Sequence, residues 1–261
     1  MSGRLGDRPV TSVLFDYGDT LMRVAVRKDE LEAARERIAR LLRERGLAPS
    51  VSAELIRQVH GVVEAALTEH ARSGALEEID LAATATSAYA QRGVPLDDRT
   101  LDDVLRIEQE AWLTGVELDP EALPTLDALR AAGIRVGLCS NAPYRVRSMH
   151  DQLAHVGLIP HLDAVTFSGE VGWRKPARRM FAAALEALDA VAAETVMVGD
   201  SPEADVAGAQ EAGIRGVLFR PAGRGASSAP GAPDAVIDRL SALPGMLGLP
   251  RLAPLEKTRR S

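Results

Sequence analysis

The sequence predicts an α/β protein: a doubly wound, Rossmann-like parallel sheet with an all-α helical bundle inserted into it. An apolar run at residues 11–15 ends in an aspartate, as expected of a buried parallel strand. Apolar residues recur at helical spacing through residues 28–113. From residue 120 onward helical and strand patterns alternate, which is the pattern of a parallel sheet. The chain has 261 residues, enough for a core domain and an insertion.

The first predicted strand, residues 11–15, carries the most informative motif at its end. Asp16 follows the strand directly, and Gly18 permits a tight turn before Asp19 and Thr20. Ligands bind at the carboxyl ends of strands in open α/β sheets, so a carboxylate here can serve as a nucleophile or hold a metal. The plainer interpretation is a strand-to-turn transition with a capping aspartate. Taken alone, the motif leaves both interpretations open.

Four helices are predicted between this strand and the next. They cover residues 30–42, 52–67, 76–92 and 100–113, and a glycine ends the first and the third. We therefore assign residues 23–114 to a helical bundle and residues 10–22 and 115–244 to the α/β core. Residues 245–261 are expected to form a disordered tail.

The rest of the core is predicted from alternating patterns. Helices are expected at residues 121–132, 144–156, 176–188 and 203–212, and strands at residues 135–139, 164–167, 195–198 and 216–219. Residues 221–233 are rich in Pro, Gly, Ser and Ala and predict a mobile loop. A last short strand and helix are expected within residues 234–243.

Three later segments add polar residues that can carry chemistry. The strand at residues 135–139 is followed by Ser140 and Asn141, and the hydroxyl can donate to a phosphate oxygen or cap the next helix. Lys175, one of three lysines, precedes a proline in a loop, where it is otherwise a solvated cation. Asp200 ends another strand and Asp205 follows on the next helix. These two carboxylates suit Mg²⁺, or else they cap and charge the first helical turn.

In their order along the chain, these four segments resemble the motifs of the haloacid dehalogenase superfamily of hydrolases, over residues 11–244. The resemblance implies a phosphatase-like enzyme in which the helical bundle is a cap inserted after the first motif. It implies that Asp16 attacks phosphorus and forms an aspartyl-phosphate. The further implied contacts are phosphate binding by Ser140, Asn141 and Lys175, and Mg²⁺ binding by Asp16, the backbone carbonyl of Gly18, Asp200 and Asp205.

The sequence departs from the family's phosphatases at Gly18. Those enzymes carry an aspartate two positions after the nucleophile, which protonates the leaving group and then activates water. At Gly18 the backbone carbonyl is kept, but the side-chain acid/base is lost, and such a group is typically worth about 10²- to 10⁴-fold in rate. The sequence leaves open whether Asp19 or a residue of the cap takes this role.

Three alternatives to a phosphatase follow from this gap. One is a catalytically degraded relative that binds a phosphorylated ligand or a partner protein; the others are a dehalogenase and a phosphonatase. An intact Asp16 favours an enzyme, and the pair Asp200 and Asp205 is unlike a dehalogenase. Phosphonatases use a cap lysine as a Schiff base, but the only lysine of the insertion, Lys28, lacks the expected flanking pattern.

Composition limits the partners of the protein. A formal net charge of −6 disfavours nonspecific binding to nucleic acid, and no apolar run approaches membrane-spanning length. No signal peptide is recognised, so we expect a cytoplasmic enzyme. The single cysteine, Cys139, excludes an internal disulfide and is expected to be a buried apolar side chain.

The expected partner is a small phosphorylated molecule, whose identity the sequence does not give; the oligomeric state is equally unspecified. Substrate choice is expected to come from the cap. His70 and Arg72, in the stretch that joins two cap helices, are candidates for contacting a substrate anion, as is Arg23 after the first motif. A solvated loop is the plainer interpretation of all three.

Overall fold

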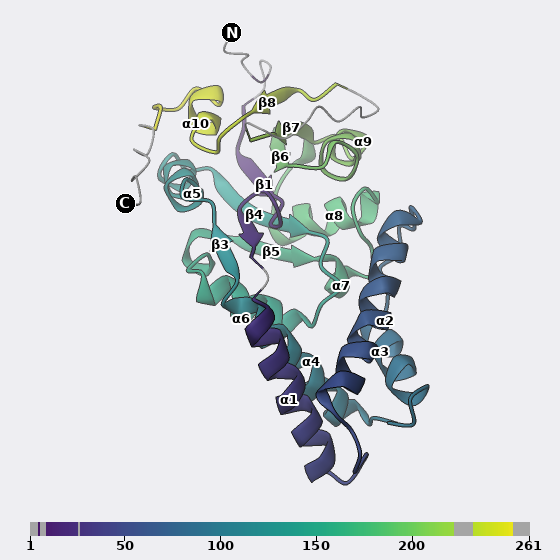
Figure 1. Ribbon diagram of the computed structural model, residues 1–261. Coiled ribbons are helices and arrows are strands. Elements are labelled where there is room, and N and C mark those ends of the chain that lie inside the picture. The colour runs from purple at the N-terminus through teal and green to yellow at the C-terminus, as the bar shows by residue number, and fades with distance from the viewer. Residues whose placement is uncertain (1–4, 6–8, 26, 222–231, 253–261) are drawn as a thin grey trace, which may run out of the picture. The chain divides into compact units, whose positions relative to one another are not determined.

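The computed structural model describes residue 5 and residues 9–25, 27–221 and 232–252. The chain forms two compact units. The core unit contains the described residues up to Arg23, Leu118–Asn141 and the described residues from Gly157 onward. The helical unit contains Val24–Glu117 and Ala142–Val156 (Figure 1).

The core unit is built on a six-stranded sheet in which every neighbouring pair of strands is parallel. The strand order β5-β4-β1-β6-β7-β8 confirms the predicted doubly wound sheet. The chain builds β4 and β5 on one side of β1, then returns to build β6, β7 and β8 on the other. The carboxyl end of β1 is therefore the switch point at which such sheets bind ligands. The strands are β1 (Ser12–Phe15), β4 (Arg135–Ser140), β5 (Ala164–Phe167), β6 (Thr195–Gly199), β7 (Arg215–Phe219) and β8 (Ala235–Ile237).

Helices cover both faces of this sheet (Figure 1). Leu14, Cys139 and Met197 are buried against Phe181 of α8 on one face. The thiol of Cys139 is fully buried, as predicted, and burial raises its pKa to about 12. The helical segments of the core unit are α5 (Ala122–Ala131), η1 (Ile159–His161), α7 (Ser168–Val171), α8 (Arg178–Ala187), η2 (Ala192–Glu194), η3 (Pro202–Ala207), α9 (Gly208–Glu211) and α10 (Ala242–Met246).

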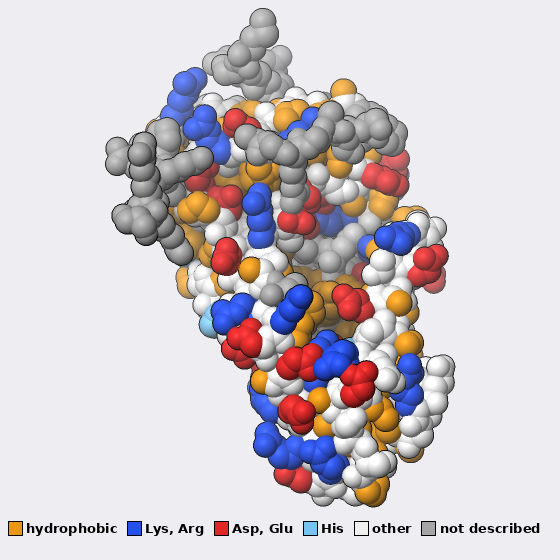
Figure 2. All heavy atoms as spheres, viewed as in Figure 1, with side chains coloured by type: hydrophobic (Ala, Val, Ile, Leu, Met, Phe, Trp, Pro, Cys, Tyr) orange, Lys and Arg blue, Asp and Glu red, His pale blue; other side chains and the backbone are white. Residues whose placement is uncertain are grey.

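The helical unit contains the four predicted helices, packed around their own apolar core. Local signals account for where three of them begin: the side chains of Ser52, Asp80 and Asp97 each accept a hydrogen bond from the first turn of the helix that follows. Charged side chains of both signs are interspersed over the face seen in Figure 2. The helices are α1 (Lys28–Glu44), α2 (Ala53–Arg72), α3 (Leu81–Ala90) and α4 (Asp98–Leu113).

The expected boundaries differ slightly from those of the two units at Arg23 and at residues 115–117, and more widely at one segment. Residues 142–156, which the sequence assigned to the core, group with the helical unit. The physical reason is that α6 (Val146–His155) packs on α4, and Arg145 forms an ion pair with Asp102 of α4. A pairing between segments this far apart leaves no local signal in the sequence.

Several smaller features were not predicted, or lie outside the described residues. Two three-residue strands, β2 (Met22–Val24) and β3 (Val116–Leu118), pair where the chain leaves and re-enters the core unit. The helix expected at residues 203–212 begins as a π-helix, η3, and continues as α9. Residues 245–252 of the expected tail are described, and α10 extends to Met246; residues 222–231 and 253–261 lie outside the described part. Among the described helices, none is both long and apolar enough to cross a membrane.

Two glycines predict opposite effects of the same added methyl group. A Cβ at Gly208 would lie 2.6 Å from Cβ of Pro176 and 2.9 Å from Cε2 of Phe181, so Gly208→Ala is expected to destabilise the fold by about 1–3 kcal/mol. A Cβ at Gly61 in α2 meets nothing within 4 Å, so Gly61→Ala is expected to stabilise by about 0.5–1 kcal/mol. Urea unfolding followed by circular dichroism measures both. An unaffected Gly208→Ala protein, or a destabilised Gly61→Ala protein, would contradict this packing.

Candidate active site

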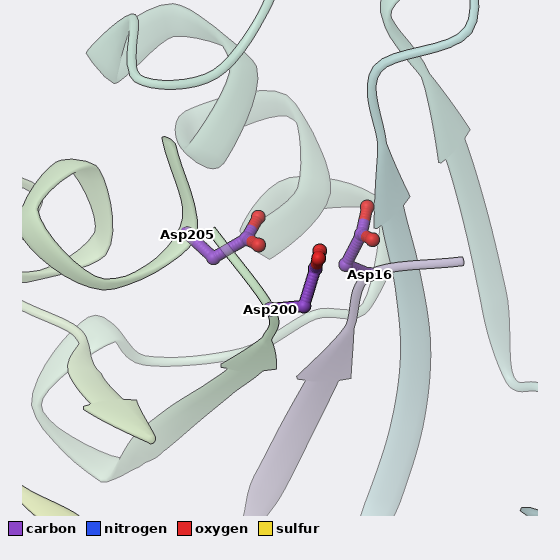
Figure 3. A group of neighbouring side chains, drawn as sticks. All are labelled: Asp16, Asp200 and Asp205. Carbon is purple, nitrogen blue, oxygen red and sulfur yellow. The ribbon is translucent and has the colours of Figure 1, made fainter. Parts of the chain in front are cut away.

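The carboxyl edge of the central strands brings three predicted residues together. Asp16 follows β1, Ser140 ends β4 and Asp200 follows β6. Because β1 pairs with β4 on one side and β6 on the other, the ends of these three strands are neighbours. Figure 3 shows the carboxylates of Asp16 and Asp200 converging from adjacent strand ends, with Asp205 reaching toward them from the next segment.

Lys175 joins the carboxylates of this edge. Its Nζ donates to Oδ1 of Asp16 and to Oδ1 of Asp205, both at 2.7 Å, and its side chain is 2% exposed. Asn141 holds the lysine's backbone: its side-chain oxygen accepts from the Lys175 N–H at 2.7 Å, and its side-chain nitrogen donates to the Lys175 carbonyl at 3.0 Å. Lys175 is thus fixed at both ends and is not a solvated loop cation.

The hydrogen bonds to Asp16 are directed at one of its two oxygens. Ser140 Oγ donates to Oδ1 at 3.1 Å, and Lys175 donates to the same atom. In the described part of the chain, no hydrogen bond engages Oδ2 of Asp16. The carboxylate is therefore held in place through one oxygen while the other is left to react.

Asp205 is held differently, through both of its oxygens. It lies on the wide turn of η3 and is 2% exposed. Its Oδ1 binds Lys175, and its Oδ2 accepts from the backbone N–H of Ser201 at 2.9 Å. Gly199 makes room for it, because a side chain at that position would overlap the Asp205 carboxylate. Sequence analysis found Asp205 but not the roles of Ser201 and Gly199, which depend on the shape of this turn.

The charges of the cluster do not balance. Burial alone would lower the pKa of Lys175, but Asp16 and Asp205 raise it by more, so the ammonium group stays charged. Burial raises the pKa of Asp205, Lys175 opposes this rise and Asp16 adds to it. When ionised, Asp16 and Asp205 together carry one negative charge more than the ammonium group of Lys175 that bonds to both of them.

This donor set fits a magnesium ion. Asp16, Asp200 and Asp205 each offer a carboxylate oxygen, and these atoms lie within 4.8 Å of one another. Carboxylate oxygens are the ligands of hard divalent cations such as Mg²⁺. The surplus of negative charge favours the same kind of ion. Because both oxygens of Asp205 already accept hydrogen bonds, whereas those of Asp16 engage Oδ1 alone among the described residues, Asp16 is better placed than Asp205 to contact a metal directly.

The turn after β1 bears on the missing acid/base. Asp19 adopts a left-handed conformation with φ of 58°, and its side chain is exposed. It does not belong to the group of three carboxylates. Gly18 does not have a positive φ, and a Cβ there would meet nothing within 4 Å. The backbone would therefore accept a side chain at Gly18, and the turn's unusual torsion angle falls on Asp19 instead.

The residues proposed for substrate contact lie outside this cluster. Arg23 is exposed in the core unit; burial raises the pKa of Asp119, and the charge of Arg23 opposes this rise. In the helical unit, a ring nitrogen of His70 lies 2.8 Å from the backbone carbonyl of Glu77, and Arg72 is exposed. Their roles in binding a substrate stay predictions.

Comparison with known proteins gives a family. Residues 10–213 match the sequence model of the haloacid dehalogenase-like hydrolases. A ribulose-1,5-bisphosphate 5-phosphatase from Halopiger xanaduensis is 40% identical over 111 residues, which cover 42% of this chain and 46% of that protein. The match thus spans about half the length of that relative. A plasmid phosphoglycolate phosphatase from Cupriavidus necator is likewise matched over 55% of its length.

Two longer matches cover most of the chain. A phosphoglycolate phosphatase from Cereibacter sphaeroides is 32% identical over 209 residues, covering 79% of this chain and 84% of that protein. Among solved structures, a 2-haloacid dehalogenase from Pseudomonas syringae is similar with a TM-score of 0.63 at 26% identity, over 92% of this chain and 98% of that one.

The close packing of Gly199 against Asp205 predicts that an added methyl group at Gly199 disturbs the site. Gly199→Ala is expected to displace Asp205, to break its hydrogen bond to Lys175, and to lower hydrolytic kcat/KM by about 10²-fold while the protein stays folded. Steady-state kinetics and thermal unfolding of the same preparations measure the two effects. Asp205→Ala is the reference: if displacement of Asp205 is the cause, the double variant is little worse than either single variant. Additive losses would show that the methyl group acts elsewhere.

Proposed function

The chain belongs to the haloacid dehalogenase-like hydrolase family, and from that premise we propose that it is a Mg²⁺-dependent phosphatase of a small phosphorylated molecule. The observation that carries the proposal is the geometry of Asp16, a buried carboxylate held through Oδ1 by Ser140 and Lys175 with Oδ2 left unengaged by hydrogen bonds in the described chain. A nucleophile that must attack phosphorus needs this combination of fixed orientation and one reactive oxygen.

The proposed reaction begins with transfer of the phosphoryl group to Asp16. Oδ2 of Asp16 attacks phosphorus, the phosphorus–oxygen bond to the leaving group breaks, and that oxygen departs with the bonding electrons. Negative charge spreads over the equatorial phosphoryl oxygens, and Lys175 and Ser140 are the side chains placed to hold them. Asn141 and Asp205 position Lys175, one through the lysine's backbone and the other through its ammonium group.

The metal would be held by Asp16, Asp200 and the backbone carbonyl of Gly18, with Asp205 orienting the cluster. When bound, Mg²⁺ supplies the positive charge that lets an anionic nucleophile approach an anionic phosphate. The residues around it have a separate task. They keep two buried carboxylates and one buried ammonium group within hydrogen-bond reach of one another.

The absence of a side chain at Gly18 is expected to affect the second half of the reaction, the hydrolysis of the aspartyl-phosphate. Water must attack the phosphorus of the aspartyl-phosphate, releasing inorganic phosphate and restoring the carboxylate of Asp16. No side chain at residue 18 can take a proton from that water, and Asp19 is exposed on a turn. We therefore expect good leaving groups, such as aryl or acyl phosphates, to react readily in the first half and hydrolysis to limit turnover.

The names of the relatives support a small phosphorylated metabolite as substrate, since they are phosphatases of ribulose-1,5-bisphosphate and of phosphoglycolate. A second candidate function is dehalogenation, which the likeness to a 2-haloacid dehalogenase favours. The three-carboxylate group weighs against it, because a dehalogenase has no need for a metal site. Dependence on metal therefore separates the two candidates.

The first test measures phosphate release from p-nitrophenyl phosphate with Mg²⁺ and with excess chelator. Wild-type protein is expected to lose its activity in chelator. Asp16→Asn is expected to lower the rate by at least about 10²-fold in a protein that stays folded, because it removes the attacking charge and keeps the shape. Activity that survives both treatments would exclude the aspartyl-phosphate route. Halide release from a 2-haloacid in the presence of chelator would favour the dehalogenase instead.

Gly18→Asp is predicted to speed turnover. Wild-type protein should show a pre-steady-state burst of aryl alcohol close to one equivalent per site, followed by a slow phase. An aspartate at residue 18 should accelerate the slow phase, by up to about 10²- to 10⁴-fold if it acts as general base. The open space and ordinary φ at Gly18 let the fold accept it. Gly18→Asn, of the same size but without a base, is the control and should leave the slow phase unchanged. Brisk hydrolysis of alkyl phosphates by the wild type, with no burst, would show that another residue supplies the acid/base.

A further inference from the structure

The helical unit contains a cavity that the proposed chemistry does not use. Its volume is about 400 Å³, which lies within the range of small-molecule sites. Every described residue that lines it belongs to the helical unit, with contributions from all four long helices and from Tyr144. Leu31, Val63, Leu67 and Leu81 provide aliphatic walls. The cavity is therefore a pocket of one unit, and its chemistry can be considered alone.

The two arginines at this cavity are already neutralised. Arg35 pairs with Glu32 at 2.5 Å, and Arg57 pairs with the same carboxylate at 2.8 Å and also contacts Glu54. These two cations and two anions form a balanced group on α1 and α2. The arginines thus offer no surplus positive charge to an anionic ligand. The third cation of the lining is Lys28, an exposed side chain at the start of α1.

Two other carboxylates at the cavity, Glu64 of α2 and Glu108 of α4, have no such partner. Within the described residues, neither forms an ion pair with a lysine or an arginine. Glu108 Oε1 lies 3.0 Å from Nδ1 of His60, and Nε2 of that ring lies 3.3 Å from the hydroxyl of Tyr89. Burial, assisted by Arg35, lowers the pKa of His60 to about 4, so at neutral pH the ring gives Glu108 a hydrogen bond but no charge.

Burial makes the negative charge of Glu108 costly, and the nearby Arg35 offsets this cost only in part. Burial raises the pKa of Glu108 to about 7; Arg35 opposes the rise and Glu64 adds to it. A second acceptor at the cavity, Oε1 of Gln109, is buried and has no hydrogen-bond partner. Both groups would be satisfied by a ligand that carries positive charge and N–H donors.

The aromatic side chains of the lining favour one kind of cation. Trp112 and Tyr144 contribute aromatic rings, which attract cations through their faces and pack well against apolar groups. A hydrated metal ion suits such walls poorly. In the part of the chain that the structure describes, the group of three carboxylates able to hold a metal is the one in the core unit.

We propose that this cavity binds a small organic ammonium ion, that is, an amine with an apolar or aromatic body. The ammonium group lies between Glu108 and Glu64, and the body packs against Trp112, Tyr144 and the aliphatic walls. The assignment does not depend on phosphatase activity. It adds to the helical unit a binding site whose specificity is set by charge and by aromatic contact.

Trp112 provides a direct readout of occupancy. The chain has two tryptophans, and the other, Trp173, lies in the core unit, so Trp173→Phe leaves Trp112 as the only tryptophan reporter. Three probes of matched size are titrated into this protein: phenethylammonium, 2-phenylethanol and 3-phenylpropanoate. The ammonium probe is expected to change the fluorescence of Trp112 saturably and to bind at least about 10-fold more tightly than the alcohol. The carboxylate probe is expected to give no saturable change.

Variants connect the signal to the carboxylates. Glu108→Gln and Glu64→Gln, each in the Trp173→Phe protein, are expected to weaken ammonium binding by about 10- to 100-fold for the buried Glu108, and by less for the exposed Glu64. Glu36→Gln removes the same charge from an exposed position of α1 and should change nothing. Asp16→Asn should also leave binding intact, which separates this inference from the proposed catalysis.

The pH dependence gives a further check. Binding should strengthen from pH 6 to pH 8 as Glu108 ionises and should be flat over that range in Glu108→Gln. The charged or titratable groups that face Glu108 are Arg35 of α1, His60 and Glu64 of α2, Tyr89 of α3, and Tyr144. Of these, His60 has its pKa well below the range and the two tyrosines have theirs raised by burial. Preferential binding of the carboxylate probe, equal binding of amine and alcohol, or full affinity in both glutamine variants would overturn the proposal.

Discussion

The ammonium group of Lys175 is the interaction on which the core site depends. An isolated charge at this depth would cost several kcal/mol, and only its hydrogen bonds to Asp16 and Asp205, both at 2.7 Å, make it tolerable. The dependence also runs the other way, because two carboxylates that share one small space would repel each other without the lysine between them. The side chain of Asn141 forms two hydrogen bonds with the backbone of Lys175 and so fixes the loop that carries the lysine. A displacement of this loop would leave buried charges unpaired.

The sheet explains why so much of this site was predictable. In a parallel sheet each strand delivers the residue after it to one edge, so an apolar run followed by a polar residue is both a structural and a functional signal. Asp16, Ser140 and Asp200 were found in this way, and the structure brings them together. What the sequence could not provide were the contacts made across the edge. The π-helical turn of η3 carries Asp205, and the absence of a side chain at Gly199 leaves room for its carboxylate. Neither feature is indicated by a pattern of neighbouring residues in the sequence.

The helical unit shows the same division between local and nonlocal information. Its four helices and their capping residues follow from spacing and side-chain chemistry close in the sequence. The grouping of residues 142–156 with this unit depends on the ion pair between Arg145 and Asp102, which join segments about forty residues apart. The charge balance of the cavity is likewise set by tertiary packing. The sequence shows many glutamates on these helices, but only the fold determines that Glu32 is neutralised and Glu108 is not.

Buried carboxylates have different partners in the two units of this chain. In the core unit, a buried lysine compensates part of the negative charge of Asp16 and Asp205, and the carboxylate oxygens of this cluster are ligands of the kind that divalent cations prefer. In the helical unit, the neighbour of Glu108 is a neutral histidine, which supplies a hydrogen bond but no charge, and Arg35 offsets only part of the effect of burial. Aliphatic and aromatic side chains line part of the cavity beside that carboxylate, whereas the core cluster consists of carboxylates and a lysine. In the two proposals, excess negative charge therefore binds an inorganic ion in one unit and an organic ion in the other, and the difference comes from the side chains that line each space.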